Sequence, residues 1–161
     1  MELYLMRHGI AEDPKNGQPD AERKLTAEGK ERAVAVVKLA RQGGMAPSLI
    51  LTSPYVRAVQ TAELAASTLN FKGDTISVPS LVPHGSPEEV WDEIRLFAES
   101  PAILLTSHQP LLGSMIGFLL SSPALQVEVR KASVTRIDVS AVRGVPRGVL
   151  QWLITPRISL A

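Results

Sequence analysis

The sequence contains no cysteine, which excludes disulfides, thiol nucleophiles and cysteine-ligated metal sites. It also lacks any apolar run near the roughly 20 residues that a membrane-spanning helix needs. The apolar stretch from Met1 to Met6 is too short for a signal peptide. We therefore expect a cytoplasmic protein that makes no membrane contact. The net charge of +1 gives no reason to expect nucleic-acid binding either.

The chain has 161 residues, a length typical of one domain, and no repeat, low-complexity segment or linker divides it. We therefore expect a single domain over residues 1–161. A chain of this size buries roughly 70% of its extended surface on folding, so a stable core is possible without disulfides. Nothing in the sequence indicates an oligomeric state.

Apolar segments alternate with amphipathic ones along most of the chain. The pattern predicts strands over residues 2–6, 48–52, 75–78, 102–106, 132–140 and 149–155. It predicts helices over residues 26–43, 54–69, 86–97 and 110–120. Strand–helix alternation implies a mostly parallel sheet with helices on both faces, and the last two strands extend it as an antiparallel edge. The expected fold class is therefore α/β, a three-layer α/β/α sandwich.

Local signals mark where these helices begin and end. Thr26 is a typical N-cap, and Gly43-Gly44 ends the helix that follows it. Pro54, after Ser53, fits the first position of the second helix, where its missing N–H costs nothing. Ser86 and Glu89 form a capping box at the start of the third.

Three of the predicted parallel strands end in polar clusters. These clusters are Arg7-His8-Gly9, Thr52-Ser53-Pro54 and Ser107-His108-Gln109. Because ligands bind beyond the carboxyl ends of the strands in such sheets, we expect the three clusters to meet at one edge. Arg57 follows one of them in the first turn of the next helix.

Two histidines and two arginines at one sheet edge suit phosphoryl chemistry. A neutral imidazole can accept a phosphoryl group, and a guanidinium matches phosphoryl oxygens with paired hydrogen bonds. Phosphoryl transfer depends mostly on positioning and charge stabilisation. Gly9 would let the backbone pass close to a phosphate, and the helix N-terminus after Ser53 would add N–H donors. Each residue alone has an ordinary structural explanation, so the prediction depends on their joint placement.

Four segments in order resemble the histidine phosphatase, or phosphoglycerate-mutase-like, superfamily. They are Leu-Met-Arg-His-Gly at residues 5–9, Leu-Thr-Ala-Glu-Gly at 25–29, the Ser-Pro-Tyr-Val-Arg-Ala-Val-Gln-Thr-Ala run at 53–62, and Ser-His-Gln-Pro at 107–110. An Arg-His-Gly triplet is a weak signal, but four segments in the right order are a strong one. The short chain and the His-Gln-Pro segment are most similar to the SixA-type phosphohistidine phosphatases.

The resemblance implies a role for each of the four central residues. His8 would be the phosphorylated nucleophile, and Arg7, Arg57 and His108 would bind the phosphoryl oxygens. Gly9 and Ser53 would add phosphate contacts. The fold would be phosphoglycerate-mutase-like. No cofactor is expected. A metal site is not expected either, because the three histidines are not part of a paired carboxylate–histidine motif.

The general acid of larger family members has no clear counterpart here. In the matching segment, residues 81–89, Ser86 stands where the SixA-type pattern often has aspartate. Glu88 is the candidate acid and His84 the second choice, although capping accounts for Ser86 and Glu89. An alkoxide leaving group needs protonation, whereas the imidazole of a phosphohistidine can already carry a proton on its other nitrogen. The lack of a clear general acid therefore favours cleavage of a P–N bond over cleavage of a P–O bond.

Three functions are compatible with this pattern. The first is removal of phosphoryl groups from protein histidines, such as those of phosphotransfer domains in signalling relays. The second is hydrolysis of small phosphomonoesters such as sugar phosphates, and the third is a catalytically silent phosphate-binding module. The four residues together argue against the third, and the short chain, with little length for covering loops, favours a phosphorylated protein as substrate. A solvated surface is the simpler interpretation of the basic residues near the C-terminal end, Arg130, Lys131, Arg136, Arg143 and Arg147.

Overall fold

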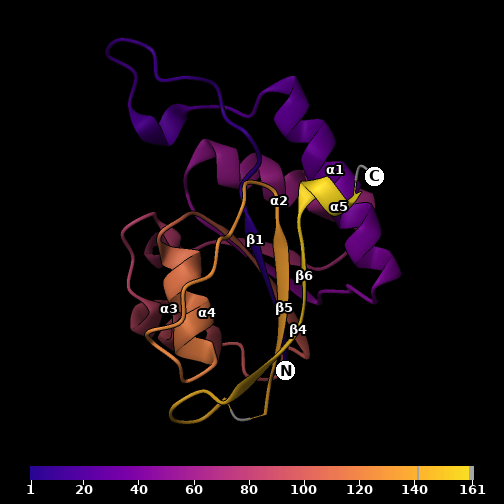
Figure 1. Ribbon diagram of the computed structural model, residues 1–161, viewed down its shortest axis with the longest axis vertical. Helices are drawn as coiled ribbons and strands as arrows, with labels where there is room; N and C mark the ends of the chain where they lie inside the picture. The colour runs from indigo at the N-terminus through magenta and orange to yellow at the C-terminus, as the bar shows by residue number, and fades with distance from the viewer. Residues whose placement is uncertain (141, 160–161) are drawn as a thin grey trace.

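The computed structural model describes residues 1–140 and 142–159, and its centre is a six-stranded sheet (Figure 1). The strands are β1 (Glu2–Arg7), β2 (Leu49–Thr52), β3 (Asp74–Ser77), β4 (Ala102–Ser107), β5 (Val134–Val139) and β6 (Gly148–Ile154). Their order is β3-β2-β4-β1-β5-β6. The first four are parallel, while β5 and β6 pair antiparallel along one edge. The predicted mostly parallel sheet with an antiparallel C-terminal edge is confirmed.

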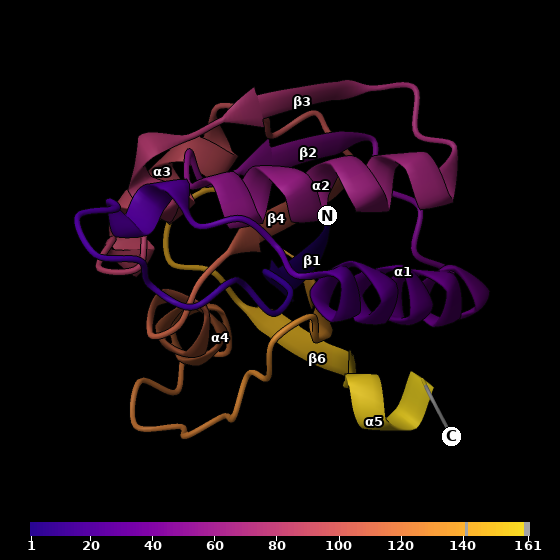
Figure 2. The ribbon, with the colours of Figure 1, turned by 90° about the horizontal axis from the view of Figure 1, so that it is seen from above.

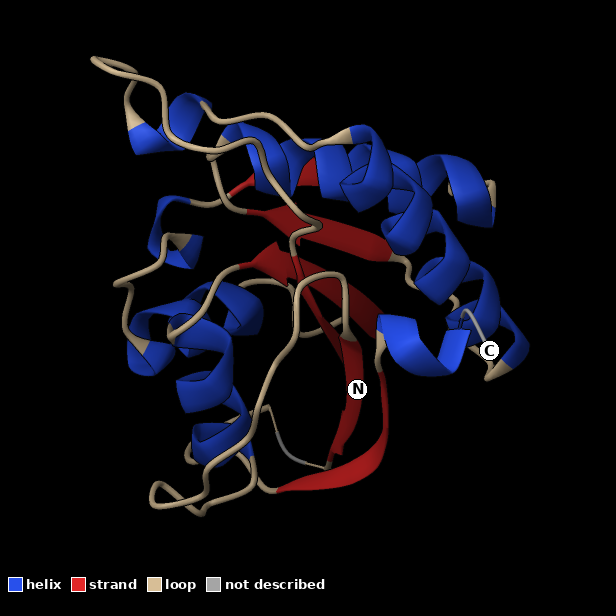
Figure 3. Ribbon diagram, turned by 45° about the horizontal axis from the view of Figure 1, so that its top comes forward, coloured by secondary structure: helices blue, strands red, loops and turns tan. Residues whose placement is uncertain are grey.

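Helices cover both faces of this sheet (Figures 2 and 3). They are α1 (Ala27–Gln42), α2 (Val56–Leu69), α3 (Pro87–Arg95), α4 (Leu111–Leu119) and the short α5 (Pro156–Ser159). Two 3-10 turns, η1 (Asp20–Glu22) and η2 (Pro79–Leu81), lie in the connections. Within the described residues, no helix combines the length and apolar character needed to cross a membrane.

Alternate residues of the central strand β1 supply two cores, because successive strand side chains point to opposite faces. Leu3 and Leu5 pack with the apolar sides of α3 and α4. Tyr4 and Met6 pack with the alanines and valines of α1 and α2. This is the three-layer α/β/α sandwich expected from the alternating pattern.

Most predicted helix signals act as expected, with one difference at α2. The Thr26 hydroxyl accepts from the Gly29 N–H at 2.9 Å, and the Ser86 hydroxyl accepts from the Glu89 N–H at 3.3 Å. The second helix begins at Val56, however, two residues after the predicted start at Pro54. The reason is that Ser53 still continues the sheet, since its N–H donates to the Thr106 carbonyl at 2.9 Å.

The register of the central strands aligns their carboxyl ends. Arg7 of β1 lies opposite Ser107 of β4, and Thr52 of β2 lies opposite Thr106. The residues that follow these strands therefore emerge side by side at one edge of the sheet. This edge is where the sequence predicted that its polar clusters would meet.

The turn after β1 is braced by the first turn of α1. The Ile10 carbonyl accepts from the Thr26 N–H at 2.9 Å, which draws the two segments together. Both facing residues are glycines because there is no room for a side chain. A Cβ atom at Gly29 would lie 2.1 Å from the Ile10 carbonyl oxygen, and one at Gly9 would lie 2.7 Å from the Gly29 carbonyl oxygen. Backbone atoms cannot yield as a flexible side chain would.

We predict that Gly29→Ala lowers the free energy of unfolding by at least about 2 kcal/mol, near or above the usual cost of overpacking. The added methyl group must push α1 away from the turn that carries His8. Urea unfolding measures the loss. Gly113→Ala in α4 is the matched control, because the nearest atom to its Cβ is the movable Gln109 amide at 3.2 Å. Equal stability of the two variants would contradict this account.

Candidate active site

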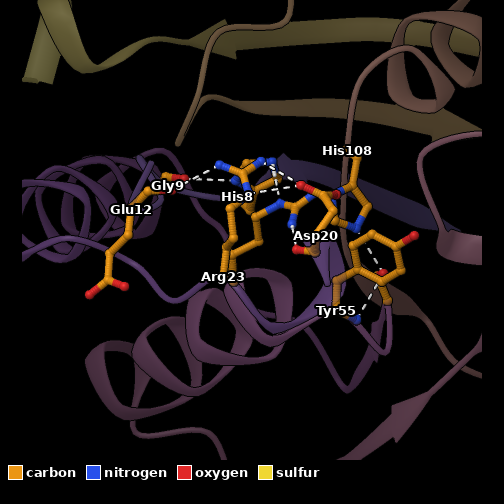
Figure 4. A network of polar contacts seen from close by, with 9 residues as sticks. His8, Gly9, Glu12, Asp20, Arg23, Tyr55 and His108 are labelled. Carbon is orange, nitrogen blue, oxygen red and sulfur yellow. Dashed lines mark hydrogen bonds and ion pairs between the residues drawn. The ribbon is translucent and has the colours of Figure 1, made fainter. Parts of the chain in front are cut away.

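Residues of the first and third strand-end clusters, with Tyr55 and Arg57 just after the second, surround one cavity of about 390 Å³. Its lining is Arg7, His8, Ala11, Asp20, Arg23, Tyr55, Arg57, Pro83, His84, His108, Gln109 and Lys131. Figure 4 shows His8, Asp20, Tyr55 and His108 gathered in one network of polar contacts. The four residues singled out from the sequence, Arg7, His8, Arg57 and His108, thus share a single wall.

The imidazole of His8 is held in one tautomer by its own backbone neighbour. Its Nδ1 lies 2.7 Å from the Gly9 carbonyl oxygen, which can only accept, so Nδ1 carries the proton. The other ring nitrogen, Nε2, is therefore unprotonated. The ring is buried, with 6% of its surface exposed. This arrangement presents an unprotonated nitrogen to the cavity, as nucleophilic attack requires.

Arg57 connects His8 to the loop that precedes α1. Its Nε donates to His8 Nε2 at 3.2 Å. Its Nη1 donates to the Asp20 main-chain carbonyl at 2.7 Å, and its Nη2 pairs with the Asp20 carboxylate at 2.9 Å. The guanidinium also stands 5.0 Å from the centre of the Tyr55 ring. A buried cation is therefore aimed at the imidazole and fixed by one outer carboxylate.

His108 faces His8 across the cavity, with the ring centres 5.0 Å apart. Its Nε2 lies 2.8 Å from the hydroxyl of Ser53, whose oxygen also accepts from the Tyr55 N–H at 3.3 Å. The edge of the Tyr55 ring packs against His108 at 4.9 Å between centres. Ser53 thus orients His108 from behind.

Two buried nitrogens in this wall have no hydrogen-bond partner among the described residues: Arg7 Nε and His108 Nδ1. Arg7 donates through Nη1 to the Val129 carbonyl at 2.8 Å, which fixes its guanidinium and leaves Nε unpaired. Buried polar atoms are nearly always paired, so orphans need an explanation. Nitrogens of this kind beside a cationic wall suit the oxygens of a bound anion.

Burial controls the protonation of this site. It lowers the pKa of both His8 and His108 to about 3, aided at His8 by the charges of Arg57, Arg7 and Lys131. Burial also lowers the pKa of Arg7, as does its neighbour Arg57. Both imidazoles are therefore neutral at pH 7, while the guanidinium groups keep their charge.

The remaining predicted site residues lie behind or outside the cavity wall. Gly9 does not line it, and its N–H donates to Thr61 Oγ1 at 3.2 Å. The contact of Gly9 with a phosphate stays a prediction. Ser53 is fully buried behind His108. Glu88 is exposed, bonded to the Ser86 hydroxyl at 2.8 Å, and absent from the lining, whereas His84 is part of it.

Sequence reasoning did not identify four of the lining residues: Asp20, Arg23, Tyr55 and Lys131. Asp20 and Arg23 lie between the first predicted strand and the first predicted helix, where η1 brings them into the cavity lining. The Asp20 carboxylate also accepts from Arg23 Nε at 2.8 Å. The charge of a loop residue does not reveal its partner, so only proximity to Arg57 distinguishes Asp20 from its acidic neighbours.

Comparison with known proteins finds similar sequences over most of the chain. The sequence model of the histidine phosphatase superfamily, branch 1, matches residues 3–81. An uncharacterized protein from Picosynechococcus sp. is 35% identical over 147 residues, covering 89% of this chain and 88% of its own. The phosphohistidine phosphatase SixA of Escherichia coli strain K12 is 27% identical over 160 residues, covering 97% and 94%.

Solved structures share the fold over nearly the whole chain. The tungstate complex of the protein histidine phosphatase SixA superposes with a TM-score of 0.86 at 23% identity, covering 98% of this chain and 99% of the other. A putative α-ribazole-5′-P phosphatase from Escherichia coli superposes with a TM-score of 0.74 at 23% identity, covering 97% of each chain. The expected phosphoglycerate-mutase-like fold is confirmed.

We predict that stability falls as the pH decreases from about 6.5 toward 4.5. An unfolded histidine has a pKa of about 6.5, whereas His8 and His108 titrate at about 3 when folded. The unfolded state therefore binds more protons in this range, which costs up to about 1.4 kcal/mol per pH unit for each histidine. Urea unfolding at several pH values should show a shallower slope for His8→Asn and His108→Asn. Gln109→Asn, a non-titrating change in the same wall, should keep the wild-type slope; identical slopes in all four proteins would contradict the burial argument.

The segments that resembled a family in the sequence are the ones that build the cavity. The first, third and fourth carry Arg7 and His8, Arg57, and His108, while the second supplies the α1 turn behind His8. The match to the family sequence model, over residues 3–81, includes the first three of these segments. The chain belongs to the histidine phosphatase superfamily, resembles its SixA-type members and is a phosphatase.

Proposed function

We propose that the protein is a phosphohistidine phosphatase that works through a phosphorylated His8. The observation that carries the proposal is the His8 tautomer. Its Nδ1–H is held by the Gly9 carbonyl at 2.7 Å, and its unprotonated Nε2 lies in the cavity wall beside the Arg57 guanidinium. A neutral imidazole with an unprotonated nitrogen at the cavity can attack phosphorus once a bound phosphoryl group takes over the hydrogen bond from Arg57.

In the first step, His8 Nε2 attacks phosphorus and a new P–N bond forms. The bond from phosphorus to the substrate nitrogen breaks, and its electron pair returns to the leaving imidazole. In the second step a water molecule attacks phosphorus, the P–Nε2 bond breaks with its electron pair returning to His8, and phosphate leaves with the oxygen and both protons of the water. His8 then returns to its neutral state, which its lowered pKa favours.

Three cavity side chains would hold the phosphoryl oxygens during both steps. Arg57 and Arg7 supply fixed positive charge, and the unpaired Arg7 Nε and His108 Nδ1 are buried polar atoms that an oxygen-rich group would satisfy. Preorganised donors in a dry site typically contribute about 2.7–4 kcal/mol each to transition-state stabilisation. A catalytically silent phosphate-binding module would not need a nucleophile aligned in this way, which argues against that alternative.

The carboxylates near the site are poor proton donors, which favours a nitrogen leaving group. Burial alone would raise the pKa of Asp20, but hydrogen bonds from Arg57 and Arg23 outweigh it and lower the pKa. The hydrogen bond from Ser86 lowers the pKa of Glu88. Both groups are therefore ionised at neutral pH. An alkoxide would leave without a carboxylic acid to protonate it, whereas a histidine imidazole needs none.

The relatives support both substrate classes, unequally. The Escherichia coli relative and the tungstate complex are named as SixA phosphohistidine phosphatases, while the α-ribazole-5′-P phosphatase is named for a small phosphomonoester. Over nearly the same share of the chain, the SixA tungstate complex matches at the higher TM-score, 0.86 against 0.74. We therefore rank a phosphorylated protein of the cytoplasm first as substrate and small phosphomonoesters second.

We predict a covalent phosphoenzyme at His8. Rapid mixing with a phosphohistidine-bearing protein labelled with ³²P, followed by quenching, should give an acid-labile, alkali-stable label that maps to His8. His8→Asn should be folded, because asparagine fills part of the same space, but should give no label. Label at His84 or His108, or none during active turnover, would refute the nucleophile assignment.

We also predict a preference for P–N over P–O substrates of at least about 100-fold in kcat/KM, since a general acid is typically worth 10²–10⁴-fold. The comparison uses a phosphohistidine protein and a sugar phosphate. Glu88→Gln should leave P–N hydrolysis within about threefold of normal.

His84→Gln provides the matched test, because His84 lines the cavity and Glu88 does not. A loss on sugar phosphates alone would identify His84 as a proton donor to oxygen leaving groups. If Glu88→Gln abolishes both activities, Glu88 is the general acid and the small-molecule alternative becomes the better one.

A further inference from the structure

A second, larger cavity of about 740 Å³ lies beside the active site. Its lining is Arg7, Ile10, Arg32, Glu128, Arg130, Lys131, Pro156 and Arg157, and we call it the basic groove. Arg7 and Lys131 line both cavities, so the two cavities lie side by side and share these side chains. The effect of the Lys131 charge on the pKa of His8 reflects the same proximity.

The groove is assembled from segments far apart in the sequence. Arg32 comes from α1, Arg130 and Lys131 from the segment between α4 and β5, and Arg157 from α5. Figure 1 shows α5 beside α1, and the two helices are in contact. No single stretch of the sequence is strongly basic, so the positive surface exists only in the folded protein.

The cations of the groove outnumber the carboxylates. Five cationic side chains line it against a single carboxylate, Glu128. Glu128 is paired with Arg130 at 3.1 Å, and Arg32 is paired with Glu28 outside the lining. Lys131 forms no ion pair with any residue that the structure describes. Like charges within a Debye length, about 10 Å at 0.1 M salt, produce a local positive potential that attracts an anionic partner.

The character of these cations favours a protein partner over a small ligand. Arg130, Lys131 and Arg157 are exposed, in contrast to the buried Arg57 of the active site. A small-molecule site encloses most of its ligand, whereas exposed cations around a partly buried apolar residue such as Ile10 suit contact with a protein surface. Because the groove shares Arg7 and Lys131 with the active site, it adjoins the position of a bound phosphohistidine.

We infer that the basic groove docks an acidic surface segment of the phosphoprotein substrate while its phosphohistidine enters the active site. This inference rests on the proposed function for the identity of the substrate. Paired charges at a partly exposed interface raise the association rate and specificity more than the rate of the chemical step. The groove is therefore expected to lower the KM for the protein substrate, and salt should weaken this effect.

The test uses charge reversal at two of the three groove arginines outside the active-site wall, Arg130→Glu and Arg157→Glu, singly and together. Arg95→Glu is the matched control on the remote helix α3. Arg95 pairs with Asp92 at 3.0 Å with side chains 45% and 71% exposed, against 3.1 Å, 46% and 74% for Arg130 and Glu128. Arg130→Gln and Arg157→Gln separate loss of attraction from new repulsion, and thermal unfolding confirms that each variant is folded.

Two substrates are compared in low salt: an acidic phosphotransfer protein phosphorylated on histidine, and phosphoramidate, which has a P–N bond and nothing to dock. The double variant should lose at least about tenfold in kcat/KM with the protein, mostly through KM, and keep its phosphoramidate activity. Arg95→Glu should match the wild type with both. Salt at 0.5 M should reduce the difference in kcat/KM between the wild type and the double variant with the protein substrate.

A binding measurement makes the result independent of turnover. A fluorescent peptide rich in glutamate should bind the wild type and bind the double variant at least about tenfold more weakly. Unchanged kinetics and unchanged peptide binding would overturn the docking role. An equal loss with both substrates would instead show that the groove serves the chemical step, and binding of anionic vesicles in place of the peptide would contradict a protein partner. Absence of phosphohistidine hydrolysis with normal peptide binding would refute the proposed function. The basic groove would then remain a docking site for acidic segments.

Discussion

The guanidinium of Arg57 is almost fully buried, and its N–H groups must therefore find acceptors inside the protein. They find the imidazole of His8, the main-chain carbonyl of Asp20 and the Asp20 carboxylate. A buried charge costs several kcal/mol unless it is well paired. Here its only carboxylate partner within the described residues is one whose side chain is 54% exposed. The positive charge thus remains incompletely neutralised and acts on the cavity.

Much of the remaining site follows from that buried charge. The Asp20 contacts require the loop before α1 to fold over the cavity, so η1 becomes part of the wall. The positive charge also helps to keep His8 neutral, together with burial, which is the larger cause. A neutral imidazole facing fixed cations is an arrangement that favours a phosphoryl group and disfavours a bound proton.

Helix α2 holds these parts in register. Its Thr61 hydroxyl accepts from the Gly9 N–H at 3.2 Å and donates to the Arg57 carbonyl at 2.7 Å. The Gln60 side chain accepts from the Leu25 N–H at 2.8 Å. One helix therefore carries Arg57, ties down the turn after His8 and anchors the segment that leads into α1. The glycine contact between that turn and α1 completes the same support from the other side.

The sequence alone determined the layers of the fold and the principal residues of the site. Periodic apolar residues and capping signals are local features, and the rule that parallel strands end at one edge is general, so the meeting of His8, His108 and the segment carrying Arg57 could be predicted. The start of α2 was missed because Ser53 is used by the sheet, a long-range contact. The contributions of Asp20 and of the basic groove were decided by tertiary structure. Arg136 illustrates the reason: it stands close to Lys131 in the sequence, yet it pairs with Glu2 and Asp138 instead of lining the groove. The partner of a charged side chain depends on which distant segments fold beside it, and residue type carries no record of that choice.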